Sequence, residues 1–72
     1  MKYPNIEAER ARLGLSKVEL SKSIGVALKT YYNWINGDNP IPSDVLIRMS
    51  EMFGTNIDYL LGISENRKRD AV

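Results

Sequence analysis

Apolar residues recur along the chain at the spacing of short helices, and no stretch alternates between apolar and polar residues as a strand does. One helical face of residues 43–53, for example, carries Val45, Leu46, Met49 and either Met52 or Phe53. A glycine follows each apolar segment, and glycine commonly ends a helix because it adopts the left-handed backbone conformation. The pattern predicts an all-α domain with five short helices, over residues 5–13, 16–25, 28–36, 43–53 and 57–61.

Short polar side chains precede four of these segments and predict where the helices begin. Such side chains cap a helix by accepting hydrogen bonds from its first backbone N–H groups. The candidates are Asn5, Ser16, Ser43 and Asn56. Glu19 follows Ser16 at the spacing of a capping box. Pro40 and Pro42 exclude a helix between the third and fourth segments, because proline fixes the backbone and lacks the N–H donor.

The composition limits the chemistry that the chain can carry. Its 72 residues form one domain at most. Cysteine and histidine are both absent, which removes disulfides, thiolate metal sites, the usual metal ligand and the usual general base. We therefore expect no metal, no cofactor and no enzymatic activity, and nothing marks a small-molecule substrate.

The distribution of apolar residues also bears on location. No apolar run approaches the roughly 20 residues that span a bilayer, and the N-terminus lacks the apolar stretch of a signal peptide. The absence of cysteine fits a reducing compartment. We expect a soluble cytoplasmic protein without membrane contact.

Charge is nearly balanced over the chain. The net charge is +1, from 10 basic and 9 acidic residues. Nucleic-acid binding favours a basic surface, so any such function depends on where the charges sit. Residues 63–72 are polar and charged, with Arg67, Lys68 and Arg69 in a row. We expect residues 1–62 to form the domain and residues 63–72 to be a disordered tail or linker.

The segment from Lys17 to Asn36 has the spacing of two short helices joined by a tight turn. Ser21 is small enough for two helices to cross at a steep angle, and Gly25 follows four residues later. Tyr31 and Trp34 stand six and nine positions beyond Gly25. The residues expected to close a common core are Leu20, Ile24, Val26, Tyr31 and Trp34.

These features, with others along the chain, carry a resemblance to a known family. The matching runs are Leu13-Gly14-Leu15-Ser16, Glu19-Leu20, Gly25-Val26, Trp34, Asn36-Gly37 and Ile57-Asp58-Tyr59-Leu60-Leu61. Over roughly residues 5 to 62 the chain resembles the phage-repressor and Cro type of helix-turn-helix protein, the XRE-like transcriptional regulators. The resemblance implies a five-helix, lambda-repressor-like domain. It also implies a sequence-specific regulator of transcription, expected to be a repressor that binds a palindromic double-stranded DNA operator as a homodimer.

The resemblance makes the third helix the recognition helix, which lies in the major groove. At about 100° per residue, one face of residues 28–36 is mostly polar and the other mostly apolar. The outer face carries Leu28, Lys29, Tyr32, Asn33 and Asn36. The inner face carries Thr30, Tyr31, Trp34 and Ile35. A purely structural helix would show the same division, so only the resemblance assigns the outer face to DNA.

The chemistry of each side chain gives its expected role on DNA. Lys29 is expected to donate to guanine, and Asn33 to pair with adenine. Apolar contact with thymine methyl groups is expected from Ala27 and Leu28. Contacts with the sugar-phosphate backbone are expected from Tyr32, Asn36 and Lys17, which begins the second helix.

Two positions and one loop depart from the family pattern. Ala27 stands where a serine or threonine cap is common, so the side chain cannot cap the third helix. Ile35 stands where an acidic partner for a first-helix arginine is common, which leaves Arg10 to pair with Glu7 or to face solvent or phosphate. Residues 38–42 contain no basic side chain, although this loop is usually basic. Modest monomer affinity and dependence on dimerisation follow.

Some alternatives stay open. The residues expected to form a dimer contact are Met52, Phe53, Ile57, Tyr59, Leu60 and Ile63, and core packing explains most of them equally well. The basic run near the C-terminus either leads to a second domain, touches DNA as an arm or is simply solvated. The second functional hypothesis is a protein-interaction module, such as an antitoxin or anti-repressor component, with weak or no DNA binding. The near-neutral charge favours it.

Overall fold

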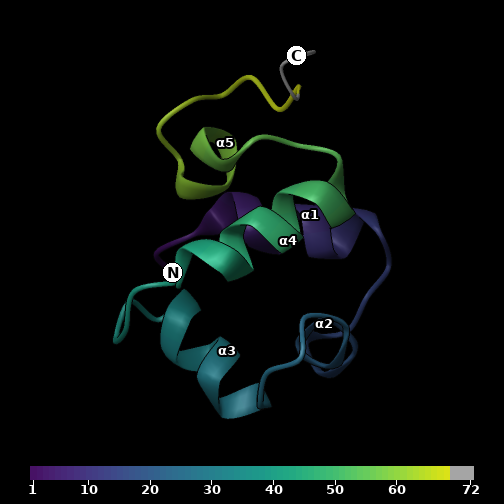
Figure 1. The fold of residues 1–72 in the computed structure, drawn as a ribbon, viewed down its shortest axis with the longest axis vertical. Helices are drawn as coiled ribbons and strands as arrows, with labels where there is room; N and C mark the ends of the chain where they lie inside the picture. The colour runs from purple at the N-terminus through teal and green to yellow at the C-terminus, as the bar shows by residue number, and fades with distance from the viewer. Residues whose placement is uncertain (69–72) are drawn as a thin grey trace.

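The computed structural model of the chain describes residues 1–68; Arg69, the last residue of the basic run, lies outside the described residues. Within that range the fold is all-helical, as the sequence pattern predicts (Figure 1). The helices are α1 (Pro4–Arg12), α2 (Lys17–Ser23), α3 (Leu28–Ile35), α4 (Ser43–Phe53) and α5 (Ile57–Leu61). Among residues 1–68, none of the helices has the length and apolar character needed to cross a membrane.

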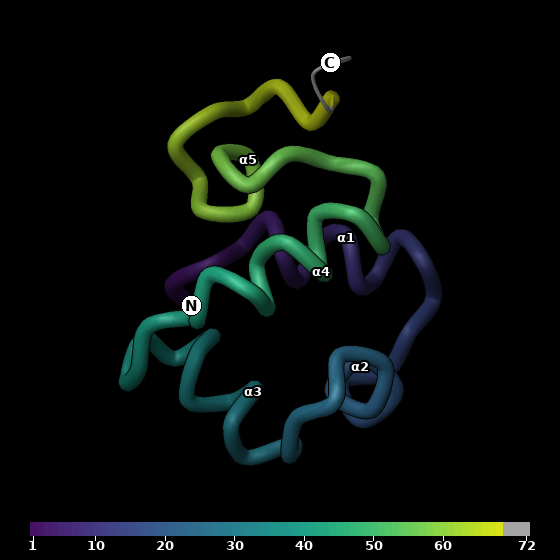
Figure 2. Tube along the Cα trace, viewed as in Figure 1, coloured from purple at the N-terminus to yellow at the C-terminus, as the bar shows by residue number. Residues whose placement is uncertain are grey.

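The helices form a bundle elongated along one axis. In Figures 1 and 2, α4 crosses the middle of the molecule, α2 and α3 lie toward one end, and α5 with the following chain lies toward the other. Contacts between helices join α1 to α5, α2 to α3, and α4 to α5. The helix pair that carries the predicted turn is therefore at the opposite end from the C-terminal segment.

Every helix contributes to one hydrophobic core. The most completely buried apolar residues are Ile6, Leu20, Ile24, Tyr31, Met49 and Leu60. Trp34 and Phe53 are buried with them, while Val26 packs against the core from a partly buried position. The core predicted from residues 20–34 is confirmed.

Two of the predicted helix caps are confirmed. The Ser16 hydroxyl accepts a 3.0 Å hydrogen bond from the Glu19 N–H, and the Glu19 carboxylate accepts one of 2.8 Å from the Ser16 N–H. These reciprocal bonds form the expected capping box and hold the pKa of Glu19 below its ordinary value. The Asn56 side chain accepts a 2.7 Å bond from the Tyr59 N–H and caps α5.

The other two predicted caps are wrong. Helix α1 begins at Pro4, because proline has no N–H to leave unpaired in the first turn and its backbone angle already suits a helix. Asn5 therefore lies inside α1, where its amide nitrogen donates a 2.7 Å bond to the Tyr59 carbonyl of α5. Ser43 is the first residue of α4, preceded by Pro42, and its side chain makes no capping bond.

Residues 63–68, the C-terminal segment, turn back onto the helices. The Asn56 amide donates bonds of 2.7 and 2.6 Å to the carbonyls of Asn66 and Lys68. Arg67 donates a 2.7 Å bond to the buried carboxylate of Glu9 in α1. This part of the predicted tail makes specific contacts where disorder was expected, and the division of the chain at residue 62 stays a prediction.

Candidate nucleic-acid interface

The turn between α2 and α3 sets the position of α3. Gly25 has a φ of +75°, in the left-handed region that disfavours residues with a Cβ atom. The Val26 N–H donates a 2.9 Å bond to the carbonyl of Ser21, whose small side chain is buried. The spacing of Ser21 and Gly25 therefore produces the tight turn that the sequence predicts, and α2 and α3 pack against each other.

The two predicted faces of α3 differ in burial. On the inner face Tyr31, Trp34 and Ile35 are buried, and Thr30 is half-buried. The outer face consists of the five predicted residues, of which three are exposed and two are half-buried. The exposed ones are Lys29, Tyr32 and Asn36, and the half-buried ones are Leu28 and Asn33. Helix α3 thus presents a mostly polar surface that packing in this domain does not use.

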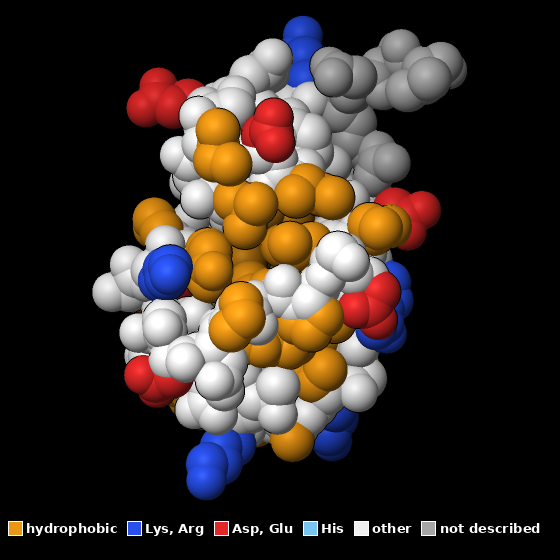
Figure 3. Space-filling view, turned by 60° about the vertical axis from the view of Figure 1, so that its left-hand side comes forward, with side chains coloured by type: hydrophobic (Ala, Val, Ile, Leu, Met, Phe, Trp, Pro, Cys, Tyr) orange, Lys and Arg blue, Asp and Glu red, His pale blue; other side chains and the backbone are white. Residues whose placement is uncertain are grey.

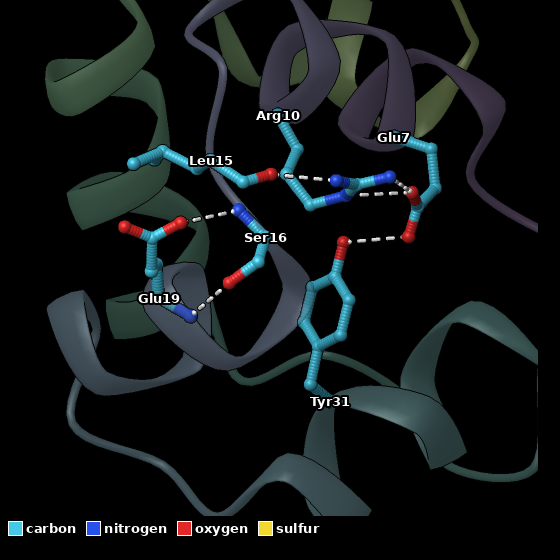
Figure 4. Close-up of polar contacts among 6 residues, drawn as sticks. All are labelled: Glu7, Arg10, Leu15, Ser16, Glu19 and Tyr31. Atoms are coloured by element: carbon cyan, nitrogen blue, oxygen red, sulfur yellow. Dashed lines mark hydrogen bonds and ion pairs between the residues drawn. The ribbon is translucent and has the colours of Figure 1, made fainter.

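A polar network fixes the inner face of α3 to α1 (Figure 4). The Tyr31 hydroxyl donates a 2.9 Å hydrogen bond to one oxygen of Glu7. Arg10 donates to the other oxygen from Nε at 2.8 Å, with a second guanidinium nitrogen 2.7 Å away. Arg10 also donates a 2.6 Å bond to the Leu15 carbonyl, ahead of α2. One group of bonds therefore joins α1, the connection to α2, and α3.

This network shows what Arg10 pairs with when position 35 is an isoleucine and not an acidic residue. Of the alternatives open for Arg10, pairing with Glu7 is the one observed, and the hydrogen bond from Arg10 to Glu7 raises the pKa of the guanidinium. Burial, with the bond to Glu7, raises the pKa of Tyr31 and keeps its hydroxyl protonated as a donor. The carboxylate that pairs with Arg10 thus comes from α1, and the large ring of Tyr31 is what reaches it.

Lys17 lies beside the outer face of α3. Its ammonium stands 5.5 Å from the centre of the Tyr32 ring, within the range of a cation–π contact. The first residue of α2 and an exposed residue of α3 are therefore adjacent, although 15 positions separate them. Ala27 is exposed at the N-terminus of α3, and no side chain caps that helix, as the sequence predicts.

The other end of α3 runs into residues 38–42. The Asn33 carbonyl accepts bonds of 2.8 and 3.3 Å from the N–H groups of Asp38 and Asn39, so the loop folds tightly onto the helix. Lys2 lies here too, because its N–H donates a 2.8 Å bond to the Ile35 carbonyl. Sequence reasoning missed Lys2, since no periodicity or motif connects the chain start to a helix 33 residues later.

Comparison with known proteins agrees with this geometry. The model of the helix-turn-helix family matches residues 6–60, which run from α1 into α5 and include the α2–turn–α3 unit. No curated protein and no solved structure matches the chain. The matched region contains all of the predicted contact residues, which are Lys17, Ala27, Leu28, Lys29, Tyr32, Asn33 and Asn36. As the resemblance in its sequence implies, this chain belongs to the XRE-like helix-turn-helix family of DNA-binding proteins.

Proposed function

We propose that this protein is a sequence-specific regulator of transcription that places α3 in the major groove of double-stranded DNA. The observation that carries the proposal is the division of α3 into a buried apolar face and an unused polar face beside the start of α2. A major groove about 12 Å wide admits a helix presented in this way. Membership of the helix-turn-helix family supports the same function.

The proposed roles follow from where each side chain lies. Lys29 and Asn33 read base edges, with lysine donating to guanine and asparagine pairing with adenine. Ala27 and Leu28, at the N-terminus of α3, contact thymine methyl groups. Lys17, Tyr32 and Asn36 bind the sugar-phosphate backbone and fix the register of the helix.

Repression by a homodimer is the mechanism that fits this assignment. Two copies related by a two-fold axis would occupy half-sites about 34 Å apart and block access of polymerase to the operator. Figure 3 shows hydrophobic side chains in a nearly continuous band on one face, with charged side chains mostly at its edges. Such a band is the kind of surface that a second copy covers.

Burial narrows the residues available for a dimer contact. Phe53 and Leu60 are buried in the core, so core packing, the alternative left open for them, accounts for these two residues. Ile57 and Tyr59 are partly buried against the same core. Met52 and Ile63 are 37% and 73% exposed, and they remain as proposed contacts between the two copies.

Selection of bound duplexes from random DNA tests the proposal, followed by mobility shift with the selected sequence. We expect a palindromic site and a steep loss of affinity with salt. K29A and N33A should each weaken binding to the selected site by about 5- to 150-fold, the range of one good base contact. K68A is the matched control, because the Lys68 carbonyl is bonded to Asn56 at the start of α5, the helix that lies toward the opposite end of the molecule from α3 (Figure 1). Failure of the chain to enrich any duplex at low salt would contradict the proposal.

A protein-interaction module with weak or no DNA binding is the second candidate. The near-neutral net charge and the absence of lysine and arginine from residues 38–42 favour it. This candidate predicts that no duplex is enriched and that a partner protein still binds K29A and N33A. The first candidate predicts that a specific duplex is enriched and that the same substitutions weaken binding to it.

A further inference from the structure

The start of the chain is held against the C-terminal end of α3. The bond from the Lys2 N–H occupies the carbonyl of Ile35, one of the last four carbonyls of the helix that have no partner within it. The residue that follows Lys2 in the chain, Tyr3, has its ring buried in the core. The position of Lys2 is therefore fixed by its neighbours in both the chain and the fold.

The Lys2 side chain runs along the backbone of Gly37. A Cβ atom placed on Gly37 would lie 3.1 Å from Lys2 Cδ and 3.5 Å from Lys2 Cβ, so the glycine leaves room for the aliphatic stem. Gly37 also has a φ of +82°, which independently favours glycine there. The stem is thus held at the point where α3 gives way to residues 38–42.

The ammonium group of Lys2 is available for an anion. It stands 5.9 Å from the centre of the Tyr3 ring, and within residues 1–68 no carboxylate lies within ion-pair distance of it. The residue is exposed. The adjacent loop contains Asp38 and no lysine or arginine, so Lys2 supplies positive charge to an end of α3 that the loop leaves without any.

If α3 lies in the major groove, as proposed, its length bears on which phosphates this charge reaches. The eight residues of α3 extend about 12 Å, comparable with the width of the major groove, which has a phosphate backbone on each side. Lys17 lies beside the outer face of α3, where its ammonium contacts the ring of Tyr32. Lys2 lies beyond the C-terminal end of α3, where its N–H is bonded to the Ile35 carbonyl. A helix held in the groove by cations from two separate parts of the chain is fixed in both position and tilt.

We propose that Lys2 binds a backbone phosphate of double-stranded DNA beside the C-terminal end of α3, in place of a basic residue in the loop. This inference rests on the proposed DNA-binding function. The contact is independent of base sequence, so it adds affinity and orientation and leaves the base preference unchanged. The fixed backbone and the packed stem reduce the conformational freedom that Lys2 would lose on binding.

Salt-dependent binding of the full chain to the selected duplex tests the contact. K2A removes the ammonium but retains the backbone bond to Ile35, so the fold is preserved. Log K falls with log salt, and each lost phosphate contact makes this fall shallower by about 0.9 per protomer. Between about 50 and about 200 mM salt, wild-type affinity should therefore fall about threefold further than K2A affinity for each protomer bound. K2R should behave as wild type, and K68A should leave the slope unchanged.

The outcomes separate this inference from the function on which it rests. A wild-type chain that binds no duplex overturns both. A wild-type chain that binds, with K2A matching it in affinity and slope, overturns the Lys2 contact alone. A lower slope with the same selected sequence supports the contact, whereas a changed base preference for K2A would show that Lys2 reads bases and contradict the phosphate assignment. Circular dichroism and thermal unfolding of K2A and wild type test whether the compared proteins are equally folded.

Discussion

The hydroxyl of Tyr31 donates a 2.9 Å hydrogen bond to the carboxylate of Glu7, 24 residues earlier in the chain and on a different helix. Both side chains are buried, with Tyr31 only 1% exposed. The bond therefore joins the inner face of the candidate recognition helix directly to α1. Because Glu7 is also paired with Arg10, any change at Tyr31 alters the partner set of a buried carboxylate.

Replacing Tyr31 with phenylalanine tests this connection. Y31F retains the ring in the core but leaves one oxygen of Glu7 without its buried donor. Removal of a buried hydrogen-bond partner costs about 1–3 kcal/mol, and bonds to a charged group lie in the upper part of that range. We expect the free energy of unfolding to fall by about 2 kcal/mol, measured by urea denaturation followed by circular dichroism.

Tyr32 provides the matched control, because it is the next residue in the same helix but is exposed. Y32F removes a hydroxyl that makes no hydrogen bond within residues 1–68, so its effect should stay within about 0.5 kcal/mol. Equal losses for Y31F and Y32F would show that the bond from Tyr31 to Glu7 contributes nothing to stability.

Alkaline pH should destabilise the fold through Tyr31. Burial raises the pKa of its hydroxyl above the ordinary value of 10.0, because the charged phenolate is disfavoured in the core. The stabilisation is therefore complete below pH 10 and declines as the pH rises from there toward the raised value. Thermal unfolding between pH 8 and about 11.5 should show a steeper decline for wild type than for Y31F.

Absorbance at 295 nm gives a second readout of the same shift, because it reports phenolate formation. The difference between the titration curves of wild type and Y31F should contain no transition near pH 10.0 while the chain remains folded. The transition that reports ionisation of Tyr31 should appear only at higher pH, together with loss of the helical circular dichroism signal. A difference curve with a midpoint near 10 in the folded protein would contradict the raised pKa.

The features predicted from sequence are those set by short spacings. Ser16 and Glu19 meet because the two ends of a capping box are three positions apart, and nothing else in the fold is needed. The division of α3 into two faces likewise follows from the period of a helix. Local preference also misleads where two residues compete, as when Asn5 is a good cap but Pro4 before it is the better first residue.

Features that depend on distant parts of the chain were not predictable in the same way. The sequence offered the pairing of Arg10 with Glu7 as one of several alternatives and did not select it. The bond from Tyr31 to Glu7 could not be predicted at all, because it depends on how α1 and α3 cross. Lys2 reaches α3 through a single backbone bond that no sequence pattern marks. The contact of Arg67 with Glu9 spans 58 positions, and composition alone favoured a disordered segment there.

The bond between Arg67 and Glu9 should stabilise the domain. Glu9 is buried, and its other cation, Arg12, is more distant at 3.5 Å compared with 2.7 Å for Arg67. R67A therefore leaves a buried carboxylate with one weak partner, and we expect Tm to fall by a few degrees. K68A, which changes the exposed neighbour, should leave Tm unchanged, and R67K should retain part of the effect. Identical melting of R67A and K68A would mean that the C-terminal segment adds no stability.

The contact between Lys17 and Tyr32 gives a prediction about DNA binding. A ring 5.5 Å from the ammonium restricts where Lys17 can place its charge, so the two residues should act together on one phosphate. In a double-mutant cycle on the selected duplex, K17A and Y32A should be less than additive. The expected coupling is about 0.5–1 kcal/mol, or about a two- to fivefold difference in Kd.

Y32F distinguishes the ring from the hydroxyl in that cycle. The phenylalanine ring retains the cation–π contact, so Y32F should keep the coupling to Lys17 and bind nearly as wild type. If Y32F instead loses as much affinity as Y32A, the hydroxyl itself donates to the backbone and the ring is secondary. Additive losses from K17A and Y32A would show that the two side chains contact DNA independently, and the adjacency seen in the free protein would then have no role in positioning Lys17.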